Sequence, residues 1–110
     1  MTASAGAGGA GAAARSARGG EVRRAVTIVN QRGLHARAAA QFCKLAGSFK
    51  KADVKVVRND VTVSGCSIMG LMMLAAGPGM TIEIVARGAD AEAAVEALAK
   101  LVAGGFGEED

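Results

Sequence analysis

Aromatic residues are the scarcest feature of this sequence. Its 110 residues include no tryptophan, no tyrosine and only three phenylalanines. Proteins that bind single-stranded nucleic acid stack bases on aromatic side chains along a basic groove, and here there is neither an aromatic series nor a basic stripe. The net charge is +3, and Arg15 and Arg18 near the start supply two of those charges. We therefore expect no nucleic-acid partner and a core made mainly of aliphatic side chains.

Cysteines and long apolar runs are also in short supply. Cys43 and Cys66 are the only cysteines, and no secretory apolar segment precedes them. This usage favours free thiols in a reducing, cytoplasmic compartment. No apolar run is long enough to cross a bilayer, so we expect no membrane association.

The composition divides the chain into three parts. Residues 1–20 are mostly alanine, glycine and serine with two arginines. Such a segment has little side chain to bury, and we expect it to be disordered. Residues 21–105 carry periodic apolar patterns and are expected to form one domain. We expect residues 106–110 to be an acidic tail.

Four stretches alternate in the manner of strands, over residues 21–29, 53–58, 61–64 and 80–86. Asn59 and Asp60 tolerate left-handed backbone and predict a tight turn between the middle two. The side chains expected to face the core are Val26, Ile28, Val54, Val56, Met80, Ile82 and Ile84.

Three stretches have helical periodicity, over residues 36–50, 68–74 and from Asp90 to the glycine pair at 104–105. Ser67 and Asp90 are expected to cap the second and third helices, and Glu96 and Lys100 have the spacing of a favourable ion pair. The order β-α-β-β-α-β-α contains no βαβ repeat, so we predict the α+β class.

The single histidine, His35, lies where the first helix should begin. A helix start presents unpaired N–H groups and the positive end of the helix dipole, which together favour a phosphate. Gly33 permits an unusual turn just before it, and Arg37 offers a guanidinium that matches phosphate geometry. No Asp, Glu or Cys occurs between residues 30 and 40, so we expect no metal site there. The hypothesis that remains is that His35 is itself a nucleophile that carries a group covalently.

Two sequence blocks resemble one known family. Gly33-Leu34-His35-Ala36-Arg37 is similar to the active-site motif of HPr, the histidine-containing phosphocarriers of the bacterial phosphotransferase system. Ser67-Ile68-Met69-Gly70-Leu71-Met72 is similar to the regulatory-serine motif of the same family, at nearly the family's separation. The resemblance covers about residues 22–102. It implies an open-faced sandwich in which three helices cover one face of a four-stranded antiparallel sheet.

One position departs from the family pattern. The family usually has proline directly after the arginine of the motif, and here that position is Ala38. Proline suits a first helical turn because it lacks an N–H that would be unpaired there, but alanine is also a good helix former. We therefore expect a slightly less rigid helix start and no loss of function.

The resemblance implies a chemistry and a set of partners. His35 would accept a phosphoryl group on Nδ1 from enzyme I, charged by phosphoenolpyruvate, and pass it to enzyme IIA-type domains, with Arg37 stabilising the phosphate. Such a protein is a carrier rather than a stand-alone enzyme; we expect it to need no cofactor and to act as a monomer. Whether it serves sugar uptake or a nitrogen-linked regulatory branch stays open at this stage.

The second block implies a regulatory site and a docking surface. By resemblance, Ser67 would be phosphorylated by an HPr kinase/phosphorylase. The helix after it is almost entirely apolar, more than a thin domain can bury, and exposed methionines form adaptable docking surfaces. We expect partners to contact Ile68, Met69, Leu71 and Met72.

Two functions of other classes remain open from the residues alone. A non-catalytic α+β interaction module would use His35 only as a helix cap. A small enzyme would use His35 as a general base, although neither a partner acid nor a cleft is evident in the sequence.

Overall fold

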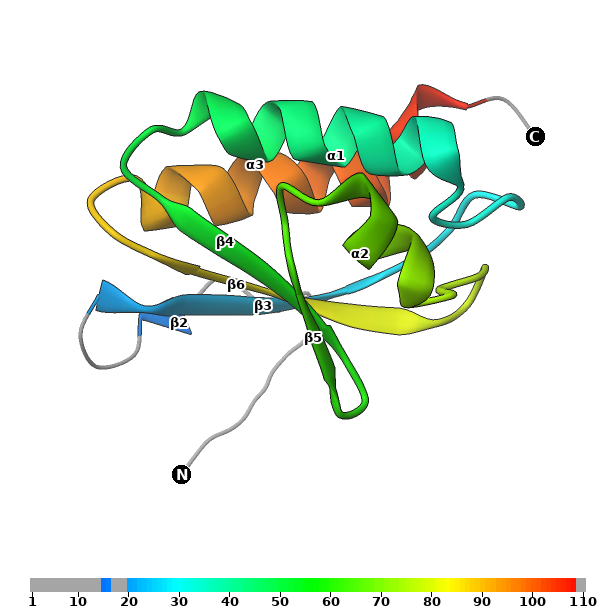
Figure 1. Cartoon of the computed structure of the whole chain (residues 1–110), viewed down its shortest axis with the longest axis horizontal. Coiled ribbons are helices and arrows are strands. Elements are labelled where there is room, and N and C mark those ends of the chain that lie inside the picture. Colours follow the sequence, from blue (N-terminus) through cyan, green and yellow to red (C-terminus); the bar gives the residue numbers. More distant parts are fainter. Residues whose placement is uncertain (1–14, 17–19, 109–110) are drawn as a thin grey trace.

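The computed structural model describes residues 15–16 and 20–108, and its elements follow the predicted order (Figure 1). The strands that correspond to the predicted ones are β3 (Val22–Thr27), β4 (Asp53–Arg58), β5 (Val61–Ser64) and β6 (Thr81–Arg87). The helices are α1 (Ala36–Ser48), α2 (Ile68–Met73) and α3 (Ala91–Ala103). The predicted β-α-β-β-α-β-α arrangement is confirmed, with α1 ending before the expected residue 50.

The sheet is antiparallel throughout and has the strand order β2-β3-β6-β4-β5. The four predicted strands account for all of it except β2 (Arg15–Ser16), which pairs with the outer edge of β3. The expectation of disorder for residues 1–20 is therefore wrong at these two residues. Its other parts, 1–14 and 17–19, lie outside the described residues.

All three helices cover the same face of the sheet (Figure 1). Between the two layers lies an aliphatic core with few aromatic side chains. Its largest fully buried members include Ile28, Phe42, Val56, Ile84 and Leu98. Val56 is paired with Ile84 across β4 and β6, so the centre of the sheet supplies much of this layer. The predicted inward positions hold, except that Val26 is only half-buried and Met80 is not buried.

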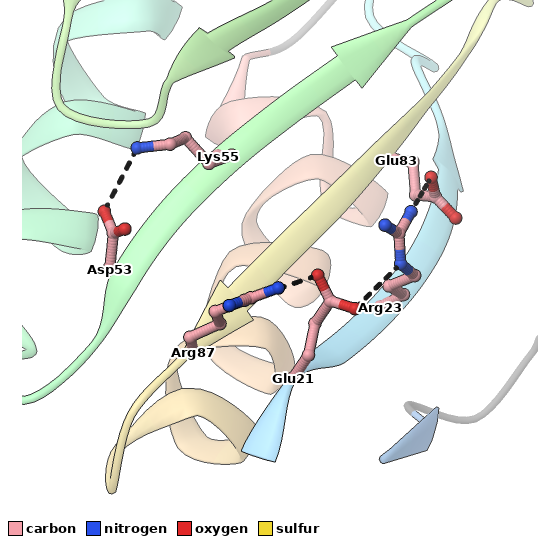
Figure 2. Close-up of polar contacts among 6 residues, drawn as sticks. All are labelled: Glu21, Arg23, Asp53, Lys55, Glu83 and Arg87. Atoms are coloured by element: carbon pink, nitrogen blue, oxygen red, sulfur yellow. Dashed lines mark hydrogen bonds and ion pairs between the residues drawn. The ribbon is translucent and has the colours of Figure 1, made fainter. Parts of the chain in front are cut away.

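The opposite face of the sheet carries charged side chains in place of a helix layer (Figure 2). Arg23 on β3 donates to Glu83 on β6 at 2.9 Å, and Glu21 lies within ion-pair distance of both Arg23 and Arg87. Exposed pairs of this kind add little stability. Their effect is to keep this face solvated, which leaves the domain as a two-layer, open-faced sandwich.

Two predictions for residues near β6 are wrong, namely that Met80 is buried and that the side chain of Asp90 caps α3. Met80 is 40% exposed, because it precedes the strand and its sulfur lies 3.1 Å from the Arg58 guanidinium. Asp90 occupies the N-cap position of α3 but makes no side-chain cap. Its carboxylate instead accepts from the backbone N–H of Lys51 at 3.1 Å, which ties the loop before α3 to the turn after α1.

The predicted ion pair on α3 is replaced by a pair between layers. Glu96 accepts a hydrogen bond at 3.0 Å from Arg24 on β3, and the spacing to Lys100 along the helix is not used. Glu96 can reach a side chain of the sheet because α3 packs directly over β3.

Structure continues beyond α3 into the segment expected to be an acidic tail. Residues Gly105–Gly107 form a single 3-10 turn, η2, in which all three residues have positive φ. Phe106 is only 3% exposed, so this part of the expected tail belongs to the core. The turn directs Glu108 back toward the start of α1.

Candidate functional site

His35 is the N-cap residue of α1, as predicted, and its side chain is 22% exposed. Gly33, two residues earlier, has φ +64°, and a β-carbon on it would lie 2.4 Å from the carbonyl oxygen of Ala76. Only glycine fits this close approach. The N–H of Leu34 donates to the same oxygen at 3.0 Å, which fixes the loop before His35 against the segment that follows α2.

The first turn of α1 makes this end of the site favourable for an anion. The N–H groups of Ala36, Arg37 and Ala38 lie in the turn whose donors have no partner within a helix, and no acidic residue occurs in that turn. Intrahelical bonding begins with Ala39, whose N–H donates to the His35 carbonyl at 2.8 Å. Residue 38 is an alanine, which keeps its N–H, so all three of these donors are present.

An open depression of about 620 Å³ adjoins the start of α1. Two guanidinium groups contribute to its wall, from Arg32 in the loop and Arg37 on α1. The remaining lining residues are Gln31, Gln41, Phe106, Gly107 and Glu108. Arg37 therefore lies at the same end of the domain as His35, as predicted, and Arg32 is an addition.

Glu108 is a residue of the site that was not predicted from the sequence. Its carboxylate bonds to Nε2 of His35 through one oxygen, and the other oxygen accepts from Nδ2 of Asn30 at 3.0 Å. The same amide nitrogen donates to the Gly33 carbonyl at 2.9 Å. Asn30 is buried, so the carboxylate is joined to the backbone of the histidine loop through a fixed side chain.

This contact sets the ionisation of Glu108. The hydrogen bond from His35, and after it the one from Asn30, lowers the pKa of the Glu108 carboxyl below its usual range. We expected no acidic residue near His35. That is correct for residues close to it in the sequence, but Glu108, 73 positions away, contacts it in the structure. The available signal was Phe106 between two glycines, an apolar residue in an acidic segment.

Ser67 is the N-cap of α2, as predicted. Its hydroxyl oxygen accepts from the Gly70 N–H at 2.9 Å, and its side chain is partly exposed. The hydroxyl is therefore held at the positive end of a short helix while remaining within reach of solvent.

The expected docking residues divide into an exposed group and one buried residue. Ile68, Met69 and Met72 are 43%, 71% and 41% exposed, and Met73, which the sequence analysis left out, is 73% exposed. We call these four side chains the α2 patch. Leu71 is fully buried, so its expected place on a docking surface is wrong. It faces the core because a helix of six residues still needs one anchoring side chain.

Comparison with known proteins gives the class of this domain. Residues 22–104 match the PTS-HPr family, described as the PTS HPr component phosphorylation site. A phosphocarrier protein HPr of Neisseria meningitidis is 48% identical over 87 residues, which cover 79% of this chain and 97% of that protein. A phosphocarrier protein NPr of Shewanella violacea is 42% identical over 88 residues, covering 80% of this chain and 96% of the relative.

Solved structures agree with the sequence relatives. The crystal structure of HPr-C-His from Thermoanaerobacter tengcongensis superposes with a TM-score of 0.75 at 38% identity, covering 80% of this chain and 98% of that one. An HPr from Bacillus anthracis gives a TM-score of 0.71 at 44% identity, covering 74% and 96%. The chain belongs to the HPr family of phosphocarrier proteins of the phosphotransferase system.

The described part of the chain contains neither a membrane-spanning helix nor a cluster of metal-binding side chains. No helix there is long and apolar enough to span a bilayer. Nor do three or more His, Cys, Asp or Glu side chains group there in a way that could hold a metal ion.

Proposed function

We propose that His35 is the residue that carries the phosphoryl group, and that Arg37 stabilises it. The observation that supports this most directly is the position of His35, a partly exposed imidazole at the N-cap of α1. Its partner Glu108 lines a depression to which two guanidinium groups also contribute. Family membership supplies the reaction, and within residues 20–108 this is the one histidine.

Phosphoryl transfer requires positioning and charge stabilisation more than covalent chemistry from the protein. The lone pair on Nδ1 attacks phosphorus, a nitrogen–phosphorus bond forms, and the bond to the donor breaks with its electron pair leaving on the donor. The charge on the phosphoryl oxygens then lies near the N–H groups of Ala36 and Arg37 and near the Arg37 guanidinium. The positive end of α1 favours this arrangement.

The proposed donor is enzyme I charged by phosphoenolpyruvate, and the proposed acceptors are enzyme IIA-type domains. The α2 patch supports this, since exposed methionines adapt to surfaces of different shape. The segment after α2 is bonded to the loop before His35 through Ala76 and Leu34, so a partner seated on the patch lies close to the imidazole. We propose that the carrier acts as a monomer in the cytoplasm, where Cys43 and Cys66 stay reduced.

We also propose that Ser67 is a regulatory phosphorylation site for an HPr kinase/phosphorylase. A phosphate on its hydroxyl lies at the positive end of α2, where the helix dipole stabilises it. The same phosphate places negative charge beside Ile68 and Met69 and disfavours docking on the α2 patch. It therefore inhibits transfer without unfolding the domain.

Intact mass spectrometry tests the carrier function. The protein is incubated with enzyme I and phosphoenolpyruvate, and its mass is measured before and after brief acid treatment. A gain of one phosphoryl group that acid removes is expected, together with no gain in His35→Ala and a slower gain in Arg37→Ala. A gain that survives acid, or one retained by His35→Ala, contradicts the assignment. Failure of the wild-type chain while enzyme I phosphorylates another carrier favours a binding module.

A further inference from the structure

We infer that Glu108 is a positioning residue for His35, holding the proton of the imidazole on Nε2 so that Nδ1 is the nitrogen free to form a bond. This inference rests on the proposed role of His35 as the phosphoryl acceptor. It extends that role by naming a second residue, 73 positions away, that sets which ring nitrogen reacts.

The contact geometry specifies the tautomer. A carboxylate has only acceptor atoms, so a carboxylate that bonds to Nε2 requires a proton on that nitrogen. In a neutral imidazole the other nitrogen, Nδ1, then carries the lone pair. The contact with Glu108 therefore leaves Nδ1 as the nitrogen that can form a new bond. The carboxylate thus selects one of two tautomers that are otherwise close in energy.

A second hydrogen bond orients the carboxylate itself. Asn30 donates from Nδ2 to the other oxygen of Glu108 at 3.0 Å and to the Gly33 carbonyl at 2.9 Å. Asn30 is 1% exposed, so its amide cannot turn freely toward solvent. The side chains form a chain of contacts, buried amide to carboxylate to imidazole, in which each member fixes the next.

The turn at η2 places Glu108 where it can make these bonds. The side chain of Phe106 is buried, and a β-carbon on Gly105 would lie 3.7 Å from Cβ of Asn30. The N–H of Glu108 donates to the Gly105 carbonyl at 3.0 Å and closes the turn. The Glu108 carboxylate is therefore held in place by a packed segment, and the Glu108 side chain is only 17% exposed.

The same contact acts on the transferred group. When Nδ1 bonds to phosphorus, the proton on Nε2 stays in place and the ring acquires positive charge. The Glu108 carboxylate faces that charge across the hydrogen bond and stabilises it, as charge-assisted hydrogen bonds do. Arg32 and Arg37 line the same depression as Glu108 and supply positive charge for the phosphoryl oxygens at this end of the domain. The charge that the ring gains on transfer is thus matched by the carboxylate at Nε2.

Nitrogen NMR of the full-length protein tests the inference directly. The two ring nitrogens of His35 are measured in the unphosphorylated wild type, in Glu108→Gln and in Glu92→Gln, at a pH where the ring is neutral. Glu92 is an exposed carboxylate on α3 and controls for the loss of one charge. We expect the proton on Nε2 in the wild type and in Glu92→Gln, and a mixture of tautomers in Glu108→Gln. A mixture in the wild type, or no change in Glu108→Gln, overturns the inference.

Transfer kinetics separate this inference from the proposed function. We expect Glu108→Gln to accept the phosphoryl group about three- to tenfold more slowly than wild type, because one charge-assisted hydrogen bond is weakened. Faster acceptance overturns the inference, since it means that the carboxylate obstructs the phosphoryl group. If the wild type accepts no phosphoryl group while its tautomer depends on Glu108, the proposed function fails and the positioning contact stands.

Discussion

The backbone of Gly33 lies so close to Ala76 that a β-carbon at residue 33 would lie 2.4 Å from the Ala76 carbonyl oxygen. Gly33→Ala therefore meets both a left-handed φ of +64° and a rigid backbone obstacle. We expect it to destabilise the domain by about 2–3 kcal/mol and to slow phosphoryl acceptance by displacing His35. Urea denaturation and transfer kinetics measure the two effects.

Gly47→Ala is the matched control for that substitution. Gly47 lies within α1, and a β-carbon there would meet nothing within 4 Å. The same change of residue should stabilise the protein by about 0.5–1 kcal/mol, because alanine is the better helix former. Equal effects at the two positions would mean that the approach of Gly33 to Ala76 carries no cost.

Substitution of Ser67 separates the cap from the charge. Ser67→Asn and Ser67→Asp both keep a side-chain oxygen that can cap α2, and only aspartate adds charge. We expect both variants to lie within about 0.5 kcal/mol of wild type in the free energy of unfolding, whereas Ser67→Ala loses about 1 kcal/mol. Phosphoryl transfer from enzyme I should fall in Ser67→Asp and not in Ser67→Asn. Transfer at the wild-type rate in Ser67→Asp would contradict the proposal that negative charge at residue 67 inhibits phosphoryl transfer.

The two most exposed methionines of the α2 patch should contribute to docking and not to stability. Met69→Ser and Met73→Ser leave the core intact, so we expect unfolding free energies within about 0.5 kcal/mol of wild type. The KM for enzyme I should rise about three- to tenfold, as for side chains near the centre of an interface. Val61→Ser changes an apolar residue that is 47% exposed on β5 and should leave KM unchanged.

Leu71 provides the opposite result on the same helix. Its side chain is fully buried, so Leu71→Ala should cost about 2–5 kcal/mol of stability by leaving a cavity. If Leu71→Ala kept wild-type stability and only raised the KM for enzyme I, Leu71 would belong to the docking face of α2 and not to its buried face.

The lowered pKa of Glu108 predicts a pH dependence of stability. A carboxyl whose pKa is lower in the folded than in the unfolded state stabilises the fold above the unfolded value, and that contribution is lost as pH falls through the folded value. Because the hydrogen bond from His35 is the largest cause, His35→Ala should raise the pKa of Glu108 and reduce the loss of stability in acid. Carbon NMR of the carboxyl group gives the pKa, and urea denaturation at neutral and acidic pH gives the stability. An unchanged Glu108 pKa in His35→Ala would show that the contact does not form in solution.

The two cysteines should differ in reactivity. Burial raises the pKa of the Cys43 thiol, and the nearby Cys66 thiolate raises it further, whereas Cys66 is exposed just before α2. Because the thiolate is the reactive form, the first equivalent of an alkylating reagent should modify Cys66. Peptide mapping after partial reaction identifies the site, and modification of Cys43 first would contradict the prediction.

Features that depend on neighbouring residues were predicted well. The strands at 53–58 and 61–64, the turn at Asn59 and the cap at Ser67 all match the structure. Each follows from alternation, from a residue that tolerates positive φ, or from a hydroxyl at a helix start, and none requires knowledge of the fold. The position of His35 at the start of α1 is of the same kind.

Features that depend on a choice among partners were not predictable in this way. Asp90 was expected to cap α3, but its carboxylate accepts from the backbone of Lys51. Glu96 was expected to pair with Lys100, but it accepts from Arg24. In each case the partner comes from another element, so the choice is made only when the layers pack. Glu108 is the extreme example, because no local pattern connects it with His35.

Protein synthesis adds residues from the amino end, so the long separation between His35 and Glu108 also orders events in time. The histidine loop, all three helices and every strand of the described sheet exist as polypeptide before Glu108 is added, since the last of these elements ends at Ala103. A nascent chain that has not reached this residue lacks the carboxylate that pairs with the imidazole. The site is thus complete only after nearly the whole domain has left the ribosome.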